Sequence, residues 1–413
     1  MTVFSPQHQF AIEIVGKLRS AGHVAFFAGG CVRDALLGRE AKDYDVATTA
    51  HPDEVRKLFG HKRTLSVGAS FGVIMVLGPR DAGQVEVATF RTEGPYLDGR
   101  RPDSVEYCTP EEDAKRRDFT INGMFYDPIE ERVLDYVGGA ADLIARMVRA
   151  IGDPHERVRE DKLRMLRAVR FAATLNFALD PTTADAIREM SSELIVVSAE
   201  RIAQEMKKML VDGHRRRAIE LADDVGMMRI VFPELDPIRR ESEWQVTLQR
   251  LDLLEAPSFE LAMAALLKPL SDESVVEKLC RRLKLSNDEC DRIGWLVGHH
   301  KDLDDATSLS LAALKRTLAH PYCKDLLKLD RADRIANSSS LEPNEFCEAF
   351  LARTPTEVLD PEPFVTGDDL IALGLKPGPR FKSILVVIRD AQLNLQIGSR
   401  DEALAMVQAI WNK

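Results

Sequence analysis

The chain has 413 residues, of which 45% are hydrophobic and 30% charged, and its formal net charge at pH 7 is −10. At about 150 residues per domain this length predicts two to four globular units, and the negative charge argues against a general nucleic-acid binder. No apolar run approaches the roughly 18 residues of a membrane helix. The first residues lack a signal-peptide pattern, and the six cysteines show no metal-ligand spacing, so a cytoplasmic protein with reduced thiols is expected.

The first informative segment contains two adjacent glycines. Residues 24–28 form an apolar run that predicts a strand, Gly29 and Gly30 predict a tight turn, and residues 32–37 have helical character. Such a turn directs the free N–H groups of a helix N-terminus toward an anion such as a triphosphate. Gly29, Gly30 and Arg33 are therefore predicted to contact a nucleotide.

Two carboxylates follow this turn. Asp43 and Asp45 are two residues apart in an expected short strand, and a period of two places both side chains on one face. There they can share divalent metal ions. Either motif alone is weak, but a phosphate-binding turn followed within about twenty residues by paired carboxylates indicates metal-assisted nucleotidyl transfer.

At these residues the chain resembles the nucleotidyltransferase superfamily of DNA polymerase β and, more narrowly, the class II tRNA nucleotidyltransferase and bacterial poly(A) polymerase family. The resemblance is dense over the N-terminal half and looser toward the C-terminus. It implies an α+β fold: a polymerase-β-like head with a small mixed sheet (1–151), then an all-α neck (152–213), body (214–340) and tail (341–413). It also implies two Mg²⁺ ions on Asp43 and Asp45, base recognition by the neck and tRNA binding by the tail.

A third carboxylate is expected on a neighbouring strand. Residues 65–77 and 84–90 predict strands joined by the glycine- and proline-containing turn 78–83. Glu86 lies in the second of these, in an alternating pattern. Polymerase-type sites often use such a carboxylate, so Glu86 is a catalytic candidate, although an exposed strand glutamate would give the same pattern.

The segment Lys115-Arg-Arg-Asp-Phe-Thr-Ile-Asn-Gly-Met matches the Arg-Arg-Asp motif of the family. Guanidinium groups bind phosphate oxygens through two parallel hydrogen bonds. We therefore expect Arg116 and Arg117 to bind phosphates, and Asp118 or Asn122 to bond the ribose hydroxyls.

Glu160-Asp-Lys-Leu-Arg164 coincides with the Glu-Asp-x-x-Arg element of the family. Periodicity predicts one helix over 157–175, on which Asp161 and Arg164 would share a face. Cytosine and adenine each present an exocyclic amine beside an unprotonated ring nitrogen. A carboxylate can accept from the amine and a guanidinium can donate to the nitrogen, whereas uracil and guanine would be repelled. An ordinary intrahelical salt bridge is the alternative.

For two further segments, only the resemblance to the family implies a function. The loop from 91 to 103 corresponds to the flexible loop associated with adding the terminal A, with Arg91, Tyr96, Arg100 and Arg101 as its candidates. Arg201 and Glu205 are spaced at i, i+4 and match an element thought to brace the nucleotide-binding helix. Glu160, Arg167 and Arg170 join them as supporting residues.

Beyond residue 152 the pattern is almost entirely helical. Apolar residues at three-and-four spacing predict helices over 182–190, 199–210, 215–225 and 260–267. Proline-bearing segments at 232–237 and 342–343 predict subdivisions, 354–363 a linker, and 366–407 a final helical block. Basic residues cluster between 146 and 170, which permits RNA binding without proving it.

These observations predict a template-independent RNA nucleotidyltransferase that adds CCA to tRNA 3′ ends from CTP and ATP, with tRNA gripped at its 3′ end and elbow. Bacterial poly(A) polymerase is the nearest alternative, but the segment 67–76 lacks the basic residues of its signature. An enzyme that adds only A also fits. A small-molecule nucleotidyltransferase would not need so much basic helix, and an inactive RNA-binding module would not need both aspartates.

Overall fold

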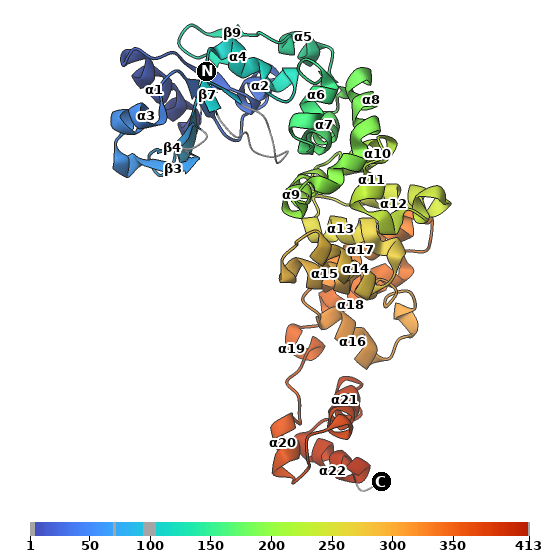
Figure 1. Ribbon diagram of the computed structural model, residues 1–413. Coiled ribbons are helices and arrows are strands. Elements are labelled where there is room, and N and C mark those ends of the chain that lie inside the picture. The colour runs from blue at the N-terminus through green and yellow to red at the C-terminus, as the bar shows by residue number, and fades with distance from the viewer. Residues whose placement is uncertain (1–4, 69–71, 94–104, 412–413) are drawn as a thin grey trace. The chain divides into compact units, whose positions relative to one another are not determined.

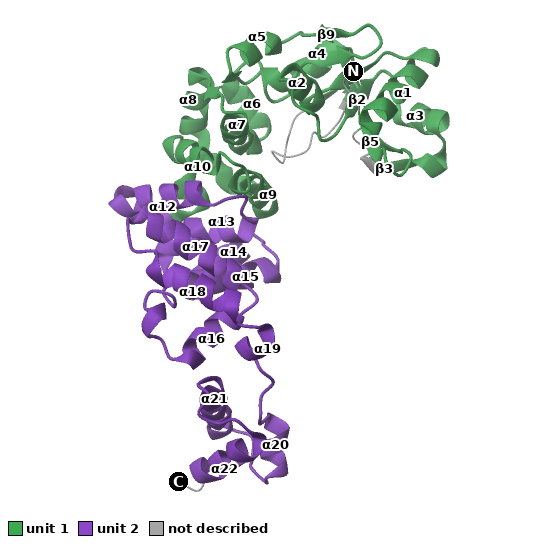
Figure 2. Cartoon of the chain, turned by 180° about the vertical axis from the view of Figure 1, so that it is seen from behind, with its two compact units in different colours: residues 1–233 green, residues 234–413 purple. Residues whose placement is uncertain are grey.

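The computed structural model describes residues 5–68, 72–93 and 105–411 (Figure 1). The chain divides into two compact units, Met1–Pro233 and Glu234–Lys413, which are coloured separately in Figure 2. The boundary lies within the proline-bearing segment 232–237, where the sequence predicts a subdivision.

A mixed sheet forms the centre of the first unit, with strand order β3-β4-β5-β2-β1-β8-β9. The neighbours β2 and β5 are parallel, whereas the other paired strands are antiparallel. The strands are β1 Ala25–Ala28, β2 Asp45–Thr48, β3 Thr64–Gly68, β4 Val73–Leu77, β5 Gln84–Thr89, β8 Phe125–Asp127 and β9 Arg132–Leu134. A separate pair joins β6 Arg91–Glu93 to β7 Val105–Tyr107. The predicted α+β head is confirmed.

Two local predictions about this sheet are wrong. Residues 65–77 do not form one strand: β3 and β4 pair antiparallel, and Gly72 has a φ of +78°, which an extended strand does not allow. Residues 69–71 between them lie outside the described ranges. Asp43 also does not lie in a strand, because β2 begins at Asp45 and Asp43 occupies a bend before it.

Helices pack against the sheet. The helix α1 (Pro6–Ser20) begins at Ser5, whose hydroxyl accepts a hydrogen bond from the backbone N–H of His8. Its buried residues Phe10, Ile14 and Leu18 recur every four positions, and they form the stripe that packs against β1, β2 and β5. The other head helices are α2 Gly30–Leu36, α3 Pro52–Phe59, α4 Pro110–Lys115, the 3₁₀ helix η3 Thr120–Asn122, and α5 Gly139–Ile144.

The rest of the first unit is helical apart from a short parallel pair, β10 (Met147–Val148) with β11 (Ala178–Leu179). The helices are α6 Pro154–Glu160, α7 Leu163–Thr174, α8 Pro181–Met190, α9 Ala199–Leu210, α10 Arg215–Asp224 and α11 Met228–Val231. Most of α7 is buried, because α9 and α10 both pack against it. The predicted bounds of α9 are confirmed, whereas the single helix predicted over 157–175 is wrong.

The second unit is formed by helices over its described residues. They are α12 Ser242–Leu253, α13 Phe259–Leu267, α14 Glu273–Arg282, α15 Asn287–Gly298, α16 Leu311–Ala319, α17 Cys323–Ala336, α18 Glu342–Arg353, α19 Thr356–Leu359, α20 Gly367–Ala372, α21 Pro379–Leu393 and α22 Arg400–Trp411. The predicted linker 354–363 therefore contains the short helix α19. Across the described ranges, every helix is too short or too polar to cross a membrane.

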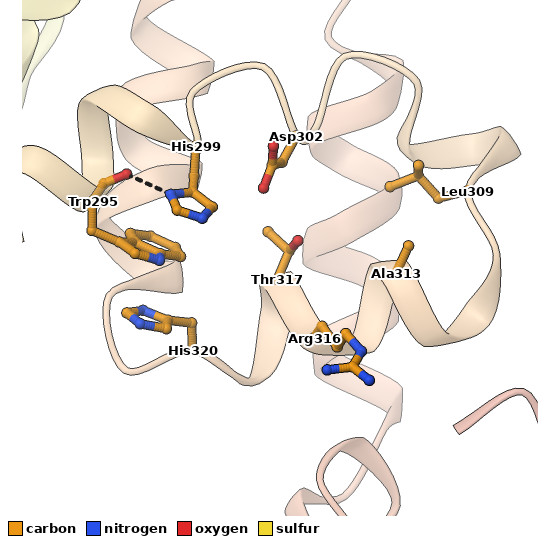
Figure 3. Close-up of a pocket in the computed structure, with 8 residues that line it drawn as sticks. All are labelled: Trp295, His299, Asp302, Leu309, Ala313, Arg316, Thr317 and His320. Carbon is orange, nitrogen blue, oxygen red and sulfur yellow. Dashed lines mark hydrogen bonds between the residues drawn. The ribbon is translucent and has the colours of Figure 1, made fainter. Parts of the chain in front are cut away.

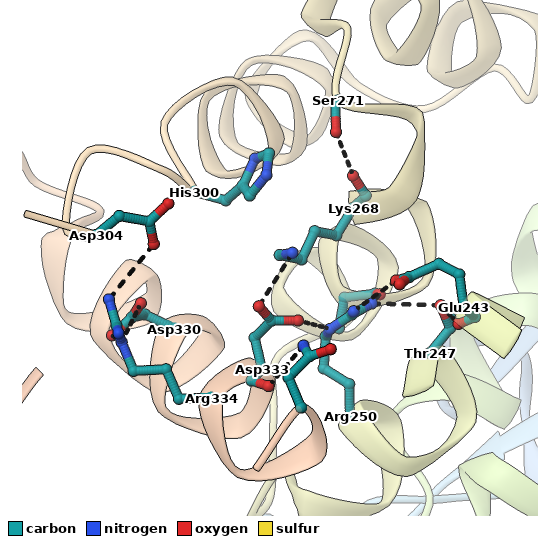
Figure 4. A network of polar contacts seen from close by, with 12 residues as sticks. Glu243, Thr247, Arg250, Lys268, Ser271, His300, Asp304, Asp330, Asp333 and Arg334 are labelled. Carbon is teal, nitrogen blue, oxygen red and sulfur yellow. Dashed lines mark hydrogen bonds and ion pairs between the residues drawn. The ribbon is translucent and has the colours of Figure 1, made fainter. Parts of the chain in front are cut away.

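A buried ionic network ties α12, α13 and α17 together (Figure 4). The side chain of Arg250 is fully buried; it donates to the carboxylates of Asp333 (2.6 Å) and Glu243 (2.9 Å) and to the backbone oxygen of Ala265 (3.1 Å). The ammonium of Lys268 lies 3.0 Å from the second oxygen of Asp333. Buried charges of this kind are tolerated only when they are paired, so the network fixes how these helices pack.

Candidate active site

The strand pairing brings two predicted carboxylates together. β2 and β5 are parallel neighbours in which Asp45 and Glu86 are direct register partners, and partners in one register share a face of the sheet. Burial raises the pKa of the Asp45 carboxyl to about 6, with further contributions from the negative charges of Glu86 and Asp43 and a partial offset by Arg117. Asp43 itself is exposed in the preceding bend.

The number of carboxylates bears on which metal ion could bind here. Among the described residues no group of three or more His, Cys, Asp or Glu side chains is placed to hold a metal ion. Mg²⁺, however, usually binds one or two protein carboxylates and completes its shell with water and substrate phosphates. The carboxylates of Asp43 and Asp45, with the exposed Glu86 as the register partner of Asp45, therefore fit Mg²⁺.

The glycine turn is needed for steric reasons that the sequence alone does not reveal. Gly29 has a φ of +71°, and a Cβ placed there would lie 3.2 Å from Nη1 of Arg117. A side chain at this position would be strained and would press on that guanidinium. Arg33, on α2, is buried and donates to the side chains of Asn122 (2.9 Å) and Asp34 (2.9 Å). Arg33 therefore helps to hold the side chain of Asn122 in place.

A cavity of about 330 Å³ collects most of the predicted nucleotide-binding residues. It is lined by Arg116, Arg117, Asp118, Asn122, Asp161, Arg164 and Arg167. These residues come from the end of α4, from η3, and from α7 and the segment that precedes it. The lining itself holds four guanidinium groups and two carboxylates, a positive excess that suits an anionic ligand.

Asp118 is an ionised carboxylate in this cavity. Nε and Nη2 of Arg167 donate to one of its oxygens at 2.9 and 2.5 Å, and the amide of Asn122 donates to the other at 3.1 Å. Burial alone would raise the pKa of Asp118, but the charge and hydrogen bonds of Arg167, with the bond from Asn122, outweigh it and lower that pKa to about 2. The Asp118 carboxylate is thus held in one orientation.

The prediction that Asp161 and Arg164 share a helix face is wrong. Asp161 ends α6 in an extended conformation (φ −145°), and its side chain accepts a hydrogen bond from the backbone N–H of Leu163, at the start of α7. Asp161 therefore ends the first helix, and its side chain bonds the first backbone N–H of the second, a local hydrogen bond that aspartate side chains form readily. The hydrophobic periodicity continues across this break, which is why the sequence suggests one helix.

Asp161 and Arg164 do not form the alternative salt bridge with each other either. The Arg164 guanidinium pairs with Glu160 and donates to the backbone oxygens of Arg157 (3.1 Å) and Arg116 (3.2 Å). Asp161 pairs with Arg201 of α9 instead. Different partners therefore hold Asp161 and Arg164 in place, and both side chains line the same cavity.

The predicted braces on α9 act between helices. Arg201 reaches Asp161, and Glu205 accepts from Nε of Arg170 on α7 at 2.5 Å. The i, i+4 spacing of these two residues is thus explained by two separate contacts, not by a bond between them. Because α9 packs along α7, Glu205 holds the helix that carries Arg164, and Arg201 holds the residue that lies just before this helix.

Two residues of the site, Asp113 and Phe171, are not predicted from the sequence. Asp113 on α4 bonds both Arg116 and Arg117, and its offsets of three and four from these arginines are the signal that could have revealed it. Phe171 on α7 is surrounded by the guanidinium groups of Arg33, Arg167 and Arg170 at 5.2, 5.4 and 4.0 Å from its ring centre. Only tertiary packing brings Arg33 to it.

Only part of the predicted loop 91–103 lies within the described residues. Arg91 begins β6, where its backbone N–H donates to Asp113 and its backbone oxygen accepts from Arg116. Tyr96, Arg100 and Arg101 lie outside the described residues.

A second cavity, of about 470 Å³, lies in the second unit (Figure 3). Its wall holds a stack in which Trp295 lies between His320 (ring centres 3.8 Å apart) and His299 (4.5 Å). His300 is buried, with Nδ1 2.6 Å from the backbone oxygen of Val297. The adjacent histidines at the end of α15 therefore differ in burial, with His300 buried and His299 partly exposed.

Comparison with known proteins places this geometry in a family. Residues 25–149 match the family described as "Poly A polymerase head domain", and residues 176–239 match "Probable RNA and SrmB- binding site of polymerase A". The CCA-adding enzyme of Pediococcus pentosaceus is 33% identical over 409 residues, covering 97% of this chain and 96% of that protein. The CCA-adding enzyme of Streptococcus gordonii is 35% identical, covering 96% of each chain.

The fold agrees with this relationship. The crystal structure of the Bacillus stearothermophilus CCA-adding enzyme in complex with CTP superposes with a TM-score of 0.79 at 30% identity, covering 98% of each chain. Identity above 30% along nearly the whole length of both proteins establishes homology over all of the chain and not over the head alone. This protein therefore belongs to the CCA-adding enzyme family of tRNA nucleotidyltransferases.

Proposed function

We propose that this protein adds C, C and A in turn to the 3′ end of tRNA, from CTP and ATP and without a nucleic-acid template. The observation that carries the proposal is the 330 Å³ cavity. It is lined by Asp161 and Arg164, the candidates for base recognition, and by Arg116 and Arg117, the candidates for phosphate binding. One of these, Arg117, also acts electrostatically on Asp45. The cavity therefore adjoins the carboxylates proposed for catalysis.

Base selection is assigned to Asp161 and Arg164. The carboxylate of Asp161 would accept from the exocyclic amine of cytosine or adenine, and Arg164 would donate to the adjacent ring nitrogen. Uracil and guanine present an acceptor and a donor in the reverse order, so the same pair would repel them. Glu160 and Arg201 would hold the two groups in place, which supports selection by the protein itself.

The remaining cavity residues would bind the triphosphate and ribose. Arg116 and Arg117 carry guanidinium groups, which form strong hydrogen bonds with phosphate oxygens. Asp118 is ionised and bonded to Asn122, so this pair can accept from and donate to ribose hydroxyls. The glycine turn at Gly29 leaves room for Arg117 beside the backbone.

Asp43 and Asp45 are the residues proposed to hold Mg²⁺, with Glu86 beside them as a catalytic candidate. When bound, Mg²⁺ would lower the pKa of the attacking RNA 3′-hydroxyl and neutralise the pyrophosphate that leaves. The protein's part is to present the carboxylate oxygens of Asp43 and Asp45 at the start of β2, where Asp45 is the register partner of Glu86 on β5.

Binding of the tRNA body is assigned to the helical part of the chain. The division into head (1–151), neck (152–213), body (214–340) and tail (341–413) remains a prediction, as do the contacts with the tRNA elbow. A basic run between residues 146 and 170 supports a local phosphate-binding surface on a protein with a net charge of −10.

One assay tests the proposal. The protein is incubated with tRNA transcripts that end before CCA, after C and after CC, with labelled CTP or ATP supplied in turn and an oligo(A) primer as control. We expect C addition to the first two transcripts, A addition only to the third, and no extension of oligo(A). Extension of oligo(A) by ATP would assign a poly(A) polymerase, and activity on the third transcript alone would assign an enzyme that adds only A.

A further inference from the structure

One buried carboxylate serves two of the guanidinium groups in the nucleotide cavity. Asp113 is 1% exposed and lies on α4. Its Oδ1 accepts from Nε (3.0 Å) and Nη2 (2.6 Å) of Arg116, and its Oδ2 accepts from Nε (3.1 Å) and Nη2 (3.0 Å) of Arg117. The Oδ1 atom also accepts from the backbone N–H of Arg91 at 3.2 Å.

We propose that Asp113 is a positioning residue for nucleotide binding: its two oxygens orient Arg116 and Arg117 toward the same wall of the cavity. This inference rests on the proposed function, in which those arginines bind the nucleotide. Asp113 does not line the cavity itself, so it acts through the arginines and not by touching the substrate.

The electrostatic reason is the cost of bringing two cations together. Arg116 and Arg117 are adjacent and both are largely buried, with 19% of each side chain exposed. Two like charges in a partly buried site repel each other strongly. The single negative charge of Asp113 leaves this trio with a net charge of +1, enough to attract a triphosphate while keeping the two groups side by side.

The surrounding contacts show how the carboxylate is kept ionised and in place. Burial alone would raise the pKa of Asp113, but Arg117 and Arg116 outweigh it, so that this pKa lies below its ordinary value. The helix α4 begins at Thr109, which forms reciprocal hydrogen bonds with Glu112, next to Asp113. The orientation is thus determined by a short, well-capped helix.

The geometry gives a specific expectation for Asp113→Asn. An asparagine side chain has one acceptor oxygen and a donating amide. Because the two arginines use different oxygens of Asp113, the variant can keep only one of them. We expect the dissociation constant for CTP, measured by equilibrium dialysis without tRNA, to rise about 10- to 100-fold, as is common when a partner behind a ligand-binding group is lost.

Glu111→Gln is the matched control, because Glu111 lies on the same helix and pairs with Lys115 on the exposed side. It should bind CTP as the wild type does. If Asp113→Asn also binds CTP with wild-type affinity, the positioning role is refuted. If the wild type itself does not bind CTP, the proposed function fails instead, so the two failures are distinguishable.

A double-mutant cycle separates positioning from general support of the fold. If Asp113 acts through Arg117, the Asp113→Asn change should weaken CTP binding little further in an Arg117→Gln background. Fully additive losses would overturn the proposal. If Asp113→Asn does not fold, Asp113→Glu is measured instead. It keeps the charge but moves the acceptor oxygens, so normal CTP affinity in that folded variant would equally refute the proposal.

Discussion

Arg201 donates to both carboxylate oxygens of Asp161, from Nη1 at 3.1 Å and from Nη2 at 2.6 Å. Such a two-point contact fixes the plane of the carboxylate as well as its position. The partners are 40 residues apart in the chain. The proposed reading of a base edge by Asp161 requires a carboxylate that does not rotate, and this contact supplies that constraint from a different helix.

Removing Arg201 should therefore disturb base reading without touching the substrate directly. We expect Arg201→Ala to lower kcat/KM for CTP and ATP on the order of 10-fold, and to increase misincorporation of UTP. Steady-state incorporation into tRNA measures both effects. Arg188→Ala is the control, since Arg188 pairs with Asp185 and Asp224 on the exposed side of α8. Equal behaviour of the two variants would contradict the bracing role.

Arg164→Ala should change the choice of nucleotide more than the rate of chemistry. Each lost base contact is worth about 1–3 kcal/mol of discrimination, so preference for CTP over UTP should fall by roughly one to two orders of magnitude. Competition assays with mixed triphosphates provide the measurement, with Arg159→Ala, an exposed residue of α6, as the control. If selectivity stays unchanged, Arg164 only supports the fold through its bonds to Glu160 and the backbone.

Asp43→Ala and Asp45→Ala should each nearly abolish incorporation while tRNA binding persists, because these side chains are proposed to hold metal and not RNA. Single-turnover incorporation at saturating Mg²⁺ and a filter-binding assay with tRNA test the two halves of this expectation. Asp81→Ala, in the exposed turn between β4 and β5, should behave as the wild type. Substantial activity in either active-site variant would exclude the two-metal assignment.

Asp45 should also make stability depend on pH. Its pKa is raised from 3.8 to about 6 in the folded protein, first by burial and then by Glu86, so the fold favours the protonated form. That contribution is fully present below about pH 4 and is lost as the pH rises through 6. Without divalent metal, Asp45→Asn should thus be more stable than the wild type at pH 7.5, by up to about 3 kcal/mol, but not at pH 4.

Thermal melts at the two pH values, with and without Mg²⁺, test this expectation. Added Mg²⁺ should raise the Tm of the wild type at pH 7.5 and leave that of Asp45→Asn nearly unchanged, because the cation stabilises the ionised carboxylate. A wild type that is as stable as the variant at pH 7.5 without metal would show that the Asp45 carboxylate is not strained by its surroundings.

In the second unit, Arg250→Met should destabilise the helical core. It leaves Asp333 and Glu243 without their shared guanidinium, and because Lys268 still pairs with Asp333, the cost should lie at or below the about 3–5 kcal/mol of a broken buried ion pair. Denaturant unfolding followed by circular dichroism measures the loss, with Arg281→Ala as an exposed control. A cost below 1 kcal/mol would mean that water or other groups replace the lost contacts.

The amino-acid sequence by itself determines the features that depend on local conformation. An apolar run, two glycines and a short helical segment predict the β1–turn–α2 unit, since a positive φ at Gly29 is a property of one residue. The bounds of α9 follow from its amphipathic spacing in the same way. The chemistry of Asp45, Arg117 and Asp161 can be inferred because residue type and motif spacing are local information.

Only the tertiary structure decides which of these groups meet. The register that sets Asp45 beside Glu86 depends on the parallel pairing of β2 with β5, which are far apart in the chain. The break at Asp161 depends on the hydrogen bond from the N–H of Leu163 to its side chain and on Arg201, neither of which alters the hydrophobic periodicity. The shared role of Asp113 likewise requires that two neighbouring arginines turn back to one carboxylate. Such contacts result from packing and from the need to pair buried charges, which no single stretch of sequence encodes.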